Sequence, residues 1–120
     1  MKVLVVDDEE MIRFLVRSTL AHVDGVEVAE ARDGEGGLRT ARETLPDLVL
    51  LDVRMPGLSG IDVCRTLRSN PQTARVRVVM LTGAGQGADV TDGYRAGADG
   101  YVIKPFTPDA LREVVLSFAA

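Results

Sequence analysis

The sequence predicts an α/β protein with a parallel five-stranded sheet between two layers of helices. Short apolar runs recur along the chain, and each ends at a polar residue or a glycine. Between these runs, apolar residues recur at spacings of three and four, which is the period of an amphipathic helix. Strands that alternate with helices over short connections are joined by right-handed crossovers, which make the strands parallel and place helices on both faces.

The first unit comprises a strand at residues 3–6 and a helix that extends to Val23. The strand is rich in valine and stops at an acidic cluster, residues 7–10. Acidic side chains in the first turn suit the helix dipole, and Asp8 has a residue type that can cap the helix. Gly25 follows the last apolar position and ends the unit.

The second unit begins with a weaker strand at residues 26–29, which we expect near an edge of the sheet. Asp33-Gly34 is a turn signal. Apolar residues over 38–45 have helical spacing, and Pro46 stops this second helix because proline cannot continue a helix interior.

The third strand, residues 48–51, is an uninterrupted aliphatic run of the kind found in buried parallel strands. It ends at Asp52, and a Pro-Gly turn at 56–57 follows. Apolar residues spaced by three over 61–67 predict the third helix, which Asn70-Pro71 breaks.

The fourth strand, residues 76–81, ends at Thr82-Gly83. The next segment, 85–97, has weak helical spacing and four glycines, each of which destabilises a helix interior by up to about 1 kcal/mol. A short, loosely held helix is therefore expected there.

The fifth strand, residues 100–103, ends at Lys104-Pro105. Thr107 has the residue type of a helix cap, and Pro108 suits the first turn. The apolar stripe that follows, which includes Leu111, predicts the last helix.

Order 2-1-3-4-5 is the common arrangement for a sheet of this size, with a switch point between strands one and three. The loops after these strands then lie side by side, and Asp7, Asp8 and Asp52 converge. Three ionised carboxylates coexist in one crevice when a cation lies among them. Carboxylate ligands without a nearby histidine or cysteine favour Mg²⁺, with Mn²⁺ as an alternative.

A metal held by few protein ligands keeps positions that a phosphate group commonly fills. Asp52 could then act as a nucleophile on a phosphoryl group. Lys104 and the Thr82 hydroxyl, at the ends of neighbouring strands, are placed to stabilise the developing charge, and the Gly83 and Ala84 amides could add to them.

With these features the chain resembles the receiver domain of bacterial two-component response regulators. The resemblance covers essentially residues 1–120 as one domain and implies a flavodoxin-like (βα)5 fold. Its motifs lie in order at strand ends: Asp7-Asp8, Asp52 with Met55-Pro56 and Gly60, Thr82-Gly83, and Lys104-Pro105-Phe106.

The resemblance implies a signalling domain, not a turnover enzyme, that accepts a phosphoryl group on Asp52 from the phosphohistidine of a histidine kinase or phosphotransfer protein. It would catalyse its own phosphorylation and slow dephosphorylation. It also implies that Asp8, Asp52 and the main-chain carbonyl of Arg54 bind Mg²⁺, with Asp7 acting directly or through water.

The resemblance further implies contacts from Lys104 and Thr82 to the phosphoryl group. Thr82 would move toward the phosphate, and the ring of Tyr101 would turn into the vacated space. The surface over roughly 90–115 would then control a homodimer, partner or effector. The peptide bond before Pro105 is expected to be cis, which proline permits at low cost.

Arg54 and Ala84 are less typical of the family and are expected to tune the phosphoryl lifetime. The Arg54 side chain would lean over the mouth of the site, where Ala84 leaves space. Two other hypotheses remain. A hydrolase of the haloacid-dehalogenase type would need a second aspartate where Arg54 stands, and a flavodoxin-like cofactor binder would need a phosphate-binding loop where residues 7–10 repel phosphate.

Composition narrows the binding partners and the cellular locations that the chain could have. Eighteen acidic and fourteen basic residues give a net charge of −4, which argues against nucleic acid binding by this chain. No apolar run approaches a membrane span, and we expect a cytoplasmic protein. Cys64 is the single cysteine, so no intramolecular disulfide forms, and it is expected to be a small buried apolar residue. Residues expected at the solvated surface are His22, Arg65, Arg68, Arg75 and Arg77.

Overall fold

The computed structural model describes residues 1–83 and 86–118 and confirms the predicted architecture. Five parallel strands form one sheet in the order β2-β1-β3-β4-β5. The strands are β1 (Lys2–Val6), β2 (Glu27–Ala31), β3 (Leu48–Asp52), β4 (Arg77–Gly83) and β5 (Gly100–Lys104). The helices are α1 (Glu10–Leu20), α2 (Gly34–Thr44), α3 (Gly60–Ser69), α4 (Gly87–Ala96) and α5 (Pro108–Ser117).

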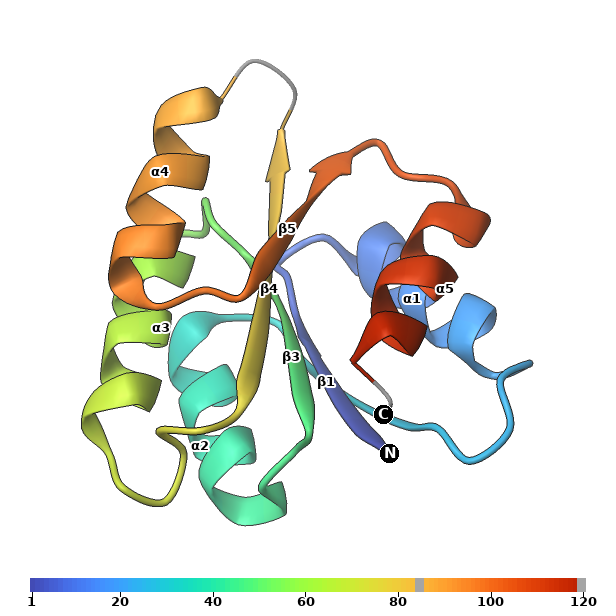
Figure 1. The fold of residues 1–120 in the computed structure, drawn as a ribbon, viewed down its shortest axis with the longest axis horizontal. Helices are drawn as coiled ribbons and strands as arrows, with labels where there is room; N and C mark the ends of the chain where they lie inside the picture. Colours follow the sequence, from blue (N-terminus) through green and yellow to red (C-terminus); the bar gives the residue numbers. More distant parts are fainter. Residues whose placement is uncertain (84–85, 119–120) are drawn as a thin grey trace.

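The helices form two layers, with α2, α3 and α4 on one face of the sheet and α1 and α5 on the other (Figure 1). Alternate residues of each central strand point into the two apolar clusters between these layers. Leu4 and Val49 pack toward α2 and α3, whereas Val5 and Leu50 pack toward α1 and α5. All of β3 is buried, as its aliphatic sequence predicts. Within the described residues, no helix is long and apolar enough to cross a membrane.

Strand register brings the predicted functional residues to one edge of the sheet. In β1 and β3, Val6 lies opposite Leu51, so the residues that follow these two strands are adjacent. In β4 and β5, Gly83 lies opposite Lys104. The carboxyl ends of the strands therefore gather side chains that are distant in the sequence.

The boundaries of α1 and α2 differ from the sequence expectations. The first helix begins after Glu9, which makes no side-chain capping bond, so the cap that Asp8 could have supplied is not formed. This helix ends at Leu20 instead of extending to Val23. Asp33, expected in a turn, is the cap of α2, where its carboxylate accepts a hydrogen bond from the Gly36 amide at 2.7 Å.

The start of α3 lies against the end of β3. A Cβ atom at Gly60 would collide with the main-chain oxygen of Asp52. The Gly60 amide also donates a hydrogen bond to the Val53 carbonyl at 2.9 Å. Glycine is therefore required here for the loop that follows Asp52 to fold back onto its strand.

The expectation that Arg68 is solvated is wrong. Its guanidinium donates to the carbonyl of Gly97 at 2.8 and 3.0 Å, donates to the carbonyl of Ala74 at 3.1 Å, and pairs with Asp99 at 3.0 Å. Arg77 also pairs with Asp99, at 3.5 Å. These contacts tie α3 to the loop that follows α4.

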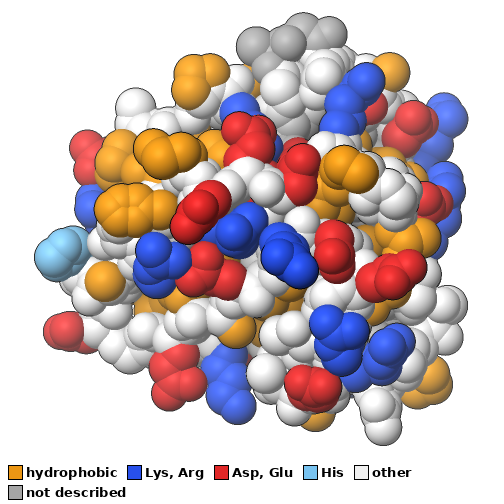
Figure 2. All heavy atoms as spheres, turned by 180° about the vertical axis from the view of Figure 1, so that it is seen from behind, with side chains coloured by type: hydrophobic (Ala, Val, Ile, Leu, Met, Phe, Trp, Pro, Cys, Tyr) orange, Lys and Arg blue, Asp and Glu red, His pale blue; other side chains and the backbone are white. Residues whose placement is uncertain are grey.

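Cys64 is fully buried, as expected, and its thiol lies 3.5 Å from the Ala96 carbonyl. On the face that Figure 2 shows, acidic and basic side chains are interspersed.

Candidate functional site

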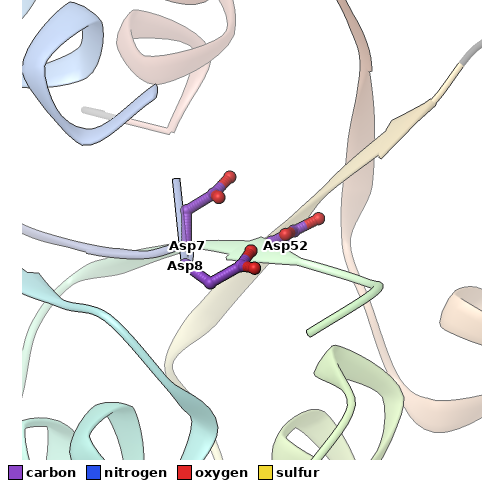
Figure 3. A group of neighbouring side chains, drawn as sticks. All are labelled: Asp7, Asp8 and Asp52. Atoms are coloured by element: carbon purple, nitrogen blue, oxygen red, sulfur yellow. The ribbon is translucent and has the colours of Figure 1, made fainter. Parts of the chain in front are cut away.

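The three carboxylates predicted to converge do so. Asp7 and Asp8 follow β1, Asp52 ends β3, and each offers an oxygen within 4.8 Å of the others (Figure 3). Asp7 is fully buried and Asp52 is 5 % exposed, whereas Asp8 is open to solvent. The cluster therefore has a closed inner side and an open outer side.

Lys104 bridges the cluster from the end of β5. Its ammonium nitrogen lies 2.8 Å from Asp7 Oδ2, 3.3 Å from Asp52 Oδ1 and 3.5 Å from Glu9 Oε1. The Asp7 contact is the shortest of the three and satisfies the buried Oδ2 atom with a charged donor. One cation thus partly neutralises three acids, which leaves the site able to accept further positive charge.

The pKa of the Asp52 carboxyl is raised from 3.8 to about 7. Burial is the largest cause, the negative charge of Asp7 adds to it, and Lys104 opposes it. Burial alone would lower the pKa of the Lys104 ammonium, but the surrounding carboxylates of Asp7 and Asp52 raise it overall. Lys104 is therefore cationic at neutral pH. In the metal-free domain, Asp52 is partly protonated near neutral pH.

Thr82 ends the buried part of β4 with its side chain 2 % exposed, and its hydroxyl has no hydrogen-bond partner among the described residues. Buried hydroxyls are usually satisfied, so an unpaired one at a strand end is typical of a functional position. The Gly83 amide, expected to face the site, instead donates to the Gln86 side chain at 3.0 Å. Ala84, the other expected amide donor, lies outside the described residues.

The Arg54 side chain does not lean over the site as expected. It reaches α4, where Nε lies 2.7 Å from Asp89 Oδ2 and Nη2 lies 3.3 Å from Oδ1. The Asp89 carboxylate raises the pKa of this guanidinium. Sequence spacing gave no signal for this pair, because its members lie 35 positions apart on different elements.

Tyr101 lies on β5 with 42 % of its surface exposed, and its ring packs edge-on against Tyr94 of α4 at a centroid distance of 6.0 Å. Beside it is a hollow of about 370 Å³. The residues that line this hollow are Thr82, Gly83, Gln86, Gly87, Val90, Tyr101 and Ile103. The peptide bond between Lys104 and Pro105 is cis.

Arg13, which lies near the site, was missed by sequence reasoning. Arg13 Nη1 donates to the main-chain oxygen of Asp7 at 2.7 Å, and Arg13 Nε lies 3.5 Å from Glu30. Arg13 follows Asp8 by five positions on a predicted amphipathic helix, where a basic side chain normally indicates a solvated face.

The comparisons with known proteins agree with this geometry. A family model described as the response regulator receiver domain matches residues 3–116. The chain belongs to this family. The receiver domain is 42% identical to the phosphate regulon transcriptional regulatory protein PhoB of Rhizobium meliloti, over 94% of the chain and 50% of that protein. It is 43% identical to the transcriptional regulatory protein ResD of Bacillus subtilis, over 99% of the chain and 47% of that protein.

Solved structures resemble the receiver domain closely. The chemotaxis protein CheY4 of Vibrio cholerae has a TM-score of 0.90 and 33% identity, over 98% of this chain and 97% of that one. The receiver domain of NtrX from Brucella abortus has a TM-score of 0.88 and 33% identity, over 97% of this chain and 96% of that one. The chain spans about half the length of the curated relatives PhoB and ResD.

Proposed function

We propose that this receiver domain accepts a phosphoryl group on Asp52 from the phosphohistidine of a histidine kinase or phosphotransfer protein, in a Mg²⁺-dependent reaction. The observation that carries the proposal is the meeting of Asp7, Asp8 and Asp52 around Lys104, at the carboxyl edge of a receiver fold. Of the three hypotheses from the sequence, a phosphoryl-accepting signalling domain fits this family, whereas a dehalogenase-type hydrolase and a cofactor binder belong to others.

The donor set fits a hard divalent cation. Carboxylate oxygens are the ligands that Mg²⁺ prefers, and the three clustered carboxylates carry more negative charge than Lys104 can neutralise. Asp8, Asp52 and the Arg54 carbonyl would hold the ion, with Asp7 acting directly or through water. When bound, Mg²⁺ supplies positive charge that keeps the carboxylates ionised and neutralises phosphoryl oxygens.

The Asp52 side chain supplies the nucleophile. A carboxylate oxygen of ionised Asp52 forms a bond to phosphorus as the bond from phosphorus to the histidine nitrogen breaks, and the imidazole leaves with the electron pair and takes up a proton. Lys104, already 3.3 Å from Asp52, contacts the transferred group and offsets its charge. The unpaired Thr82 hydroxyl donates to a phosphoryl oxygen.

The switch is supported by the exposed position of Tyr101. Thr82 and Tyr101 line the same hollow, so a shift of Thr82 toward the phosphoryl group opens space into which the Tyr101 ring can turn. The ring would then leave Tyr94, and the surface formed by α4, β5 and α5 would change. That surface carries exposed apolar side chains suited to a homodimer or effector contact: Tyr94, Tyr101, Ile103 and Leu116.

The decisive experiment is incubation with acetyl phosphate or phosphoramidate, with and without MgCl₂, followed by intact mass measurement. We expect one phosphoryl adduct per chain with Mg²⁺ and none after chelation. Asp52→Asn should abolish the adduct, whereas the control Asp92→Asn, an exposed acid on α4, should leave it unchanged. Labelling that persists in Asp52→Asn, or continuous release of phosphate without a stable adduct, would refute the proposal.

A further inference from the structure

We infer that Arg13 is a positioning residue for the metal site, acting through the backbone of Asp7 to direct the Asp8 carboxylate toward Asp52. The inference rests on the proposed function, because it concerns how the chain prepares its acids for Mg²⁺. Arg13 touches none of the three carboxylates in the described contacts; its link to them is the main-chain oxygen of Asp7.

The chain leaves the sheet at Asp7, and both backbone groups of this residue are held. Its amide donates to the Ala31 carbonyl at the end of β2, at 3.1 Å. Its carbonyl accepts from Arg13 Nη1 at 2.7 Å. The backbone path from Asp7 into Asp8 is therefore held by β2 on one side and by α1 on the other.

Arg13 is itself anchored. Its side chain is 16 % exposed, and Nε lies 3.5 Å from Glu30 Oε1 on β2. Glu30 also accepts from Arg17 Nη1 at 2.6 Å. A planar guanidinium can address a carbonyl and a carboxylate at once in fixed directions, which a lysine ammonium does less well.

The acid that most needs this support is Asp8. Asp7 is buried and its Oδ1 atom accepts the Glu9 amide at 2.9 Å, so the fold around it sets its orientation. Asp8 is exposed, and its direction depends on the backbone that carries it. Residues that orient metal ligands without touching the metal typically contribute about 10- to 100-fold in metal affinity.

Charge and positioning predict opposite outcomes when Arg13 is removed. By charge alone, loss of a cation near three acids strengthens the attraction for Mg²⁺. By positioning, loss of the hydrogen bond to Asp7 lets Asp8 reorient and weakens Mg²⁺ binding. The sign of the change in dissociation constant therefore separates the two effects.

The test is an NMR titration with MgCl₂ at constant ionic strength, following the amide signals of Asp8 and Asp52. We expect Arg13→Gln to raise the dissociation constant about tenfold and Arg13→Lys to restore part of the loss. Arg17→Gln is the matched control, because it removes the same charge from the same helix and the same Glu30 contact but makes no bond to Asp7. The Mg²⁺ dissociation constant of Arg17→Gln should equal or fall below that of the unmodified protein.

A dissociation constant for Arg13→Gln at or below that of the unmodified protein overturns the inference. Amide spectra and urea midpoints without Mg²⁺ establish that each variant is folded. If Arg13→Gln fails to fold, Arg13→Lys tests the same bond at unchanged charge and should still raise the dissociation constant for Mg²⁺. If the unmodified protein shows no Mg²⁺-dependent shift at Asp8 or Asp52, the proposed function itself fails, which is a different result.

Discussion

Arg54 and Asp89 form a two-point ion pair that joins the loop after β3 to the first turn of α4. The backbone of Arg54 belongs to the proposed metal site, while its side chain holds a helix on the surface proposed to switch. At its other end, α4 is tied through the Gly97 carbonyl to Arg68. The Arg54 pair thus makes the N-terminal end of α4 sensitive to the loop that carries the site.

Removing either partner should therefore have the same effect. We expect Arg54→Ala and Asp89→Ala each to increase hydrogen exchange in residues 87–90 several-fold and to change the phosphoryl lifetime by a similar factor. The exchanged pair Arg54→Asp with Asp89→Arg should restore both. If Arg54→Ala alters the lifetime and Asp89→Ala does not, Arg54 acts at the mouth of the site, as the sequence first indicated.

The unpaired Thr82 hydroxyl should lower the free energy of unfolding of the unphosphorylated domain. Replacing it by an isosteric apolar side chain, Thr82→Val, should stabilise the unphosphorylated domain by about 1 kcal/mol, because a buried unsatisfied hydroxyl is removed. Urea denaturation measures the change. Phosphorylation of this variant should no longer alter hydrogen exchange in α4 and β5.

Thr73 is the matched control for this substitution. It is 3 % exposed and its hydroxyl donates to the Leu67 carbonyl at 2.8 Å, so Thr73→Val should destabilise by about 1 kcal/mol. Equal effects of the two substitutions on the urea midpoint would show that Thr82 is satisfied in solution.

The sequence predicted the fold well because its local signals agree with one another. The uninterrupted run in β3, the alternation of strands with helices and the capping residue Thr107 all point to the same arrangement. The parallel order then placed Asp7, Asp8 and Asp52 together with no further information. Backbone topology alone was enough for this part of the site.

Contacts made by long side chains could not be predicted in the same way. Arg54, Arg68 and Arg13 each reach a partner set by tertiary geometry, and their sequence positions do not indicate that partner. Asp8 failed as a helix cap for a related reason: its carboxylate lies with the other acids of the site. Local capping preference therefore did not decide the conformation of Asp8, and such preferences are expected to fail at functional sites.

The raised pKa of Asp52 makes the stability of the metal-free domain depend on pH. Between about pH 4 and pH 7 the unfolded chain has lost the Asp52 proton while the folded chain retains it, so stability falls as the pH rises. At pH 8 Asp52→Asn should therefore be more stable than the unmodified protein, by on the order of 2 kcal/mol after allowance for solvent screening. The difference should disappear near pH 4.

Thermal unfolding across this pH range in a chelating buffer measures the effect. Asp92→Asn, at an exposed position, should give a curve parallel to that of the unmodified protein. Addition of MgCl₂ at pH 8 should reverse the order of stability, because the ion binds the folded unmodified protein more tightly than Asp52→Asn. Parallel curves for Asp52→Asn and the unmodified protein would contradict the assigned pKa.

Lys104 should be as important for stability as for phosphoryl transfer. It is the cation between two nearly buried carboxylates, and Lys104→Met would leave Asp7 and Asp52 without it. Loss of one partner from a buried ion pair costs about 3–5 kcal/mol, since the remaining charge stays buried. We expect a loss toward the lower end of that range in urea denaturation at pH 7 without metal, and little change for the control Lys2→Met at an exposed position.

Two further measurements separate the electrostatic cause from lost packing. Addition of MgCl₂ should recover much of the stability of Lys104→Met, because a second cation can replace the first among the acids. The double variant Lys104→Met with Asp7→Asn should likewise be more stable than Lys104→Met alone, because the buried negative charge of Asp7 is gone. Recovery by neither route would mean that the aliphatic stem of Lys104, packed with its side chain 16 % exposed, contributes the stability instead of its charge.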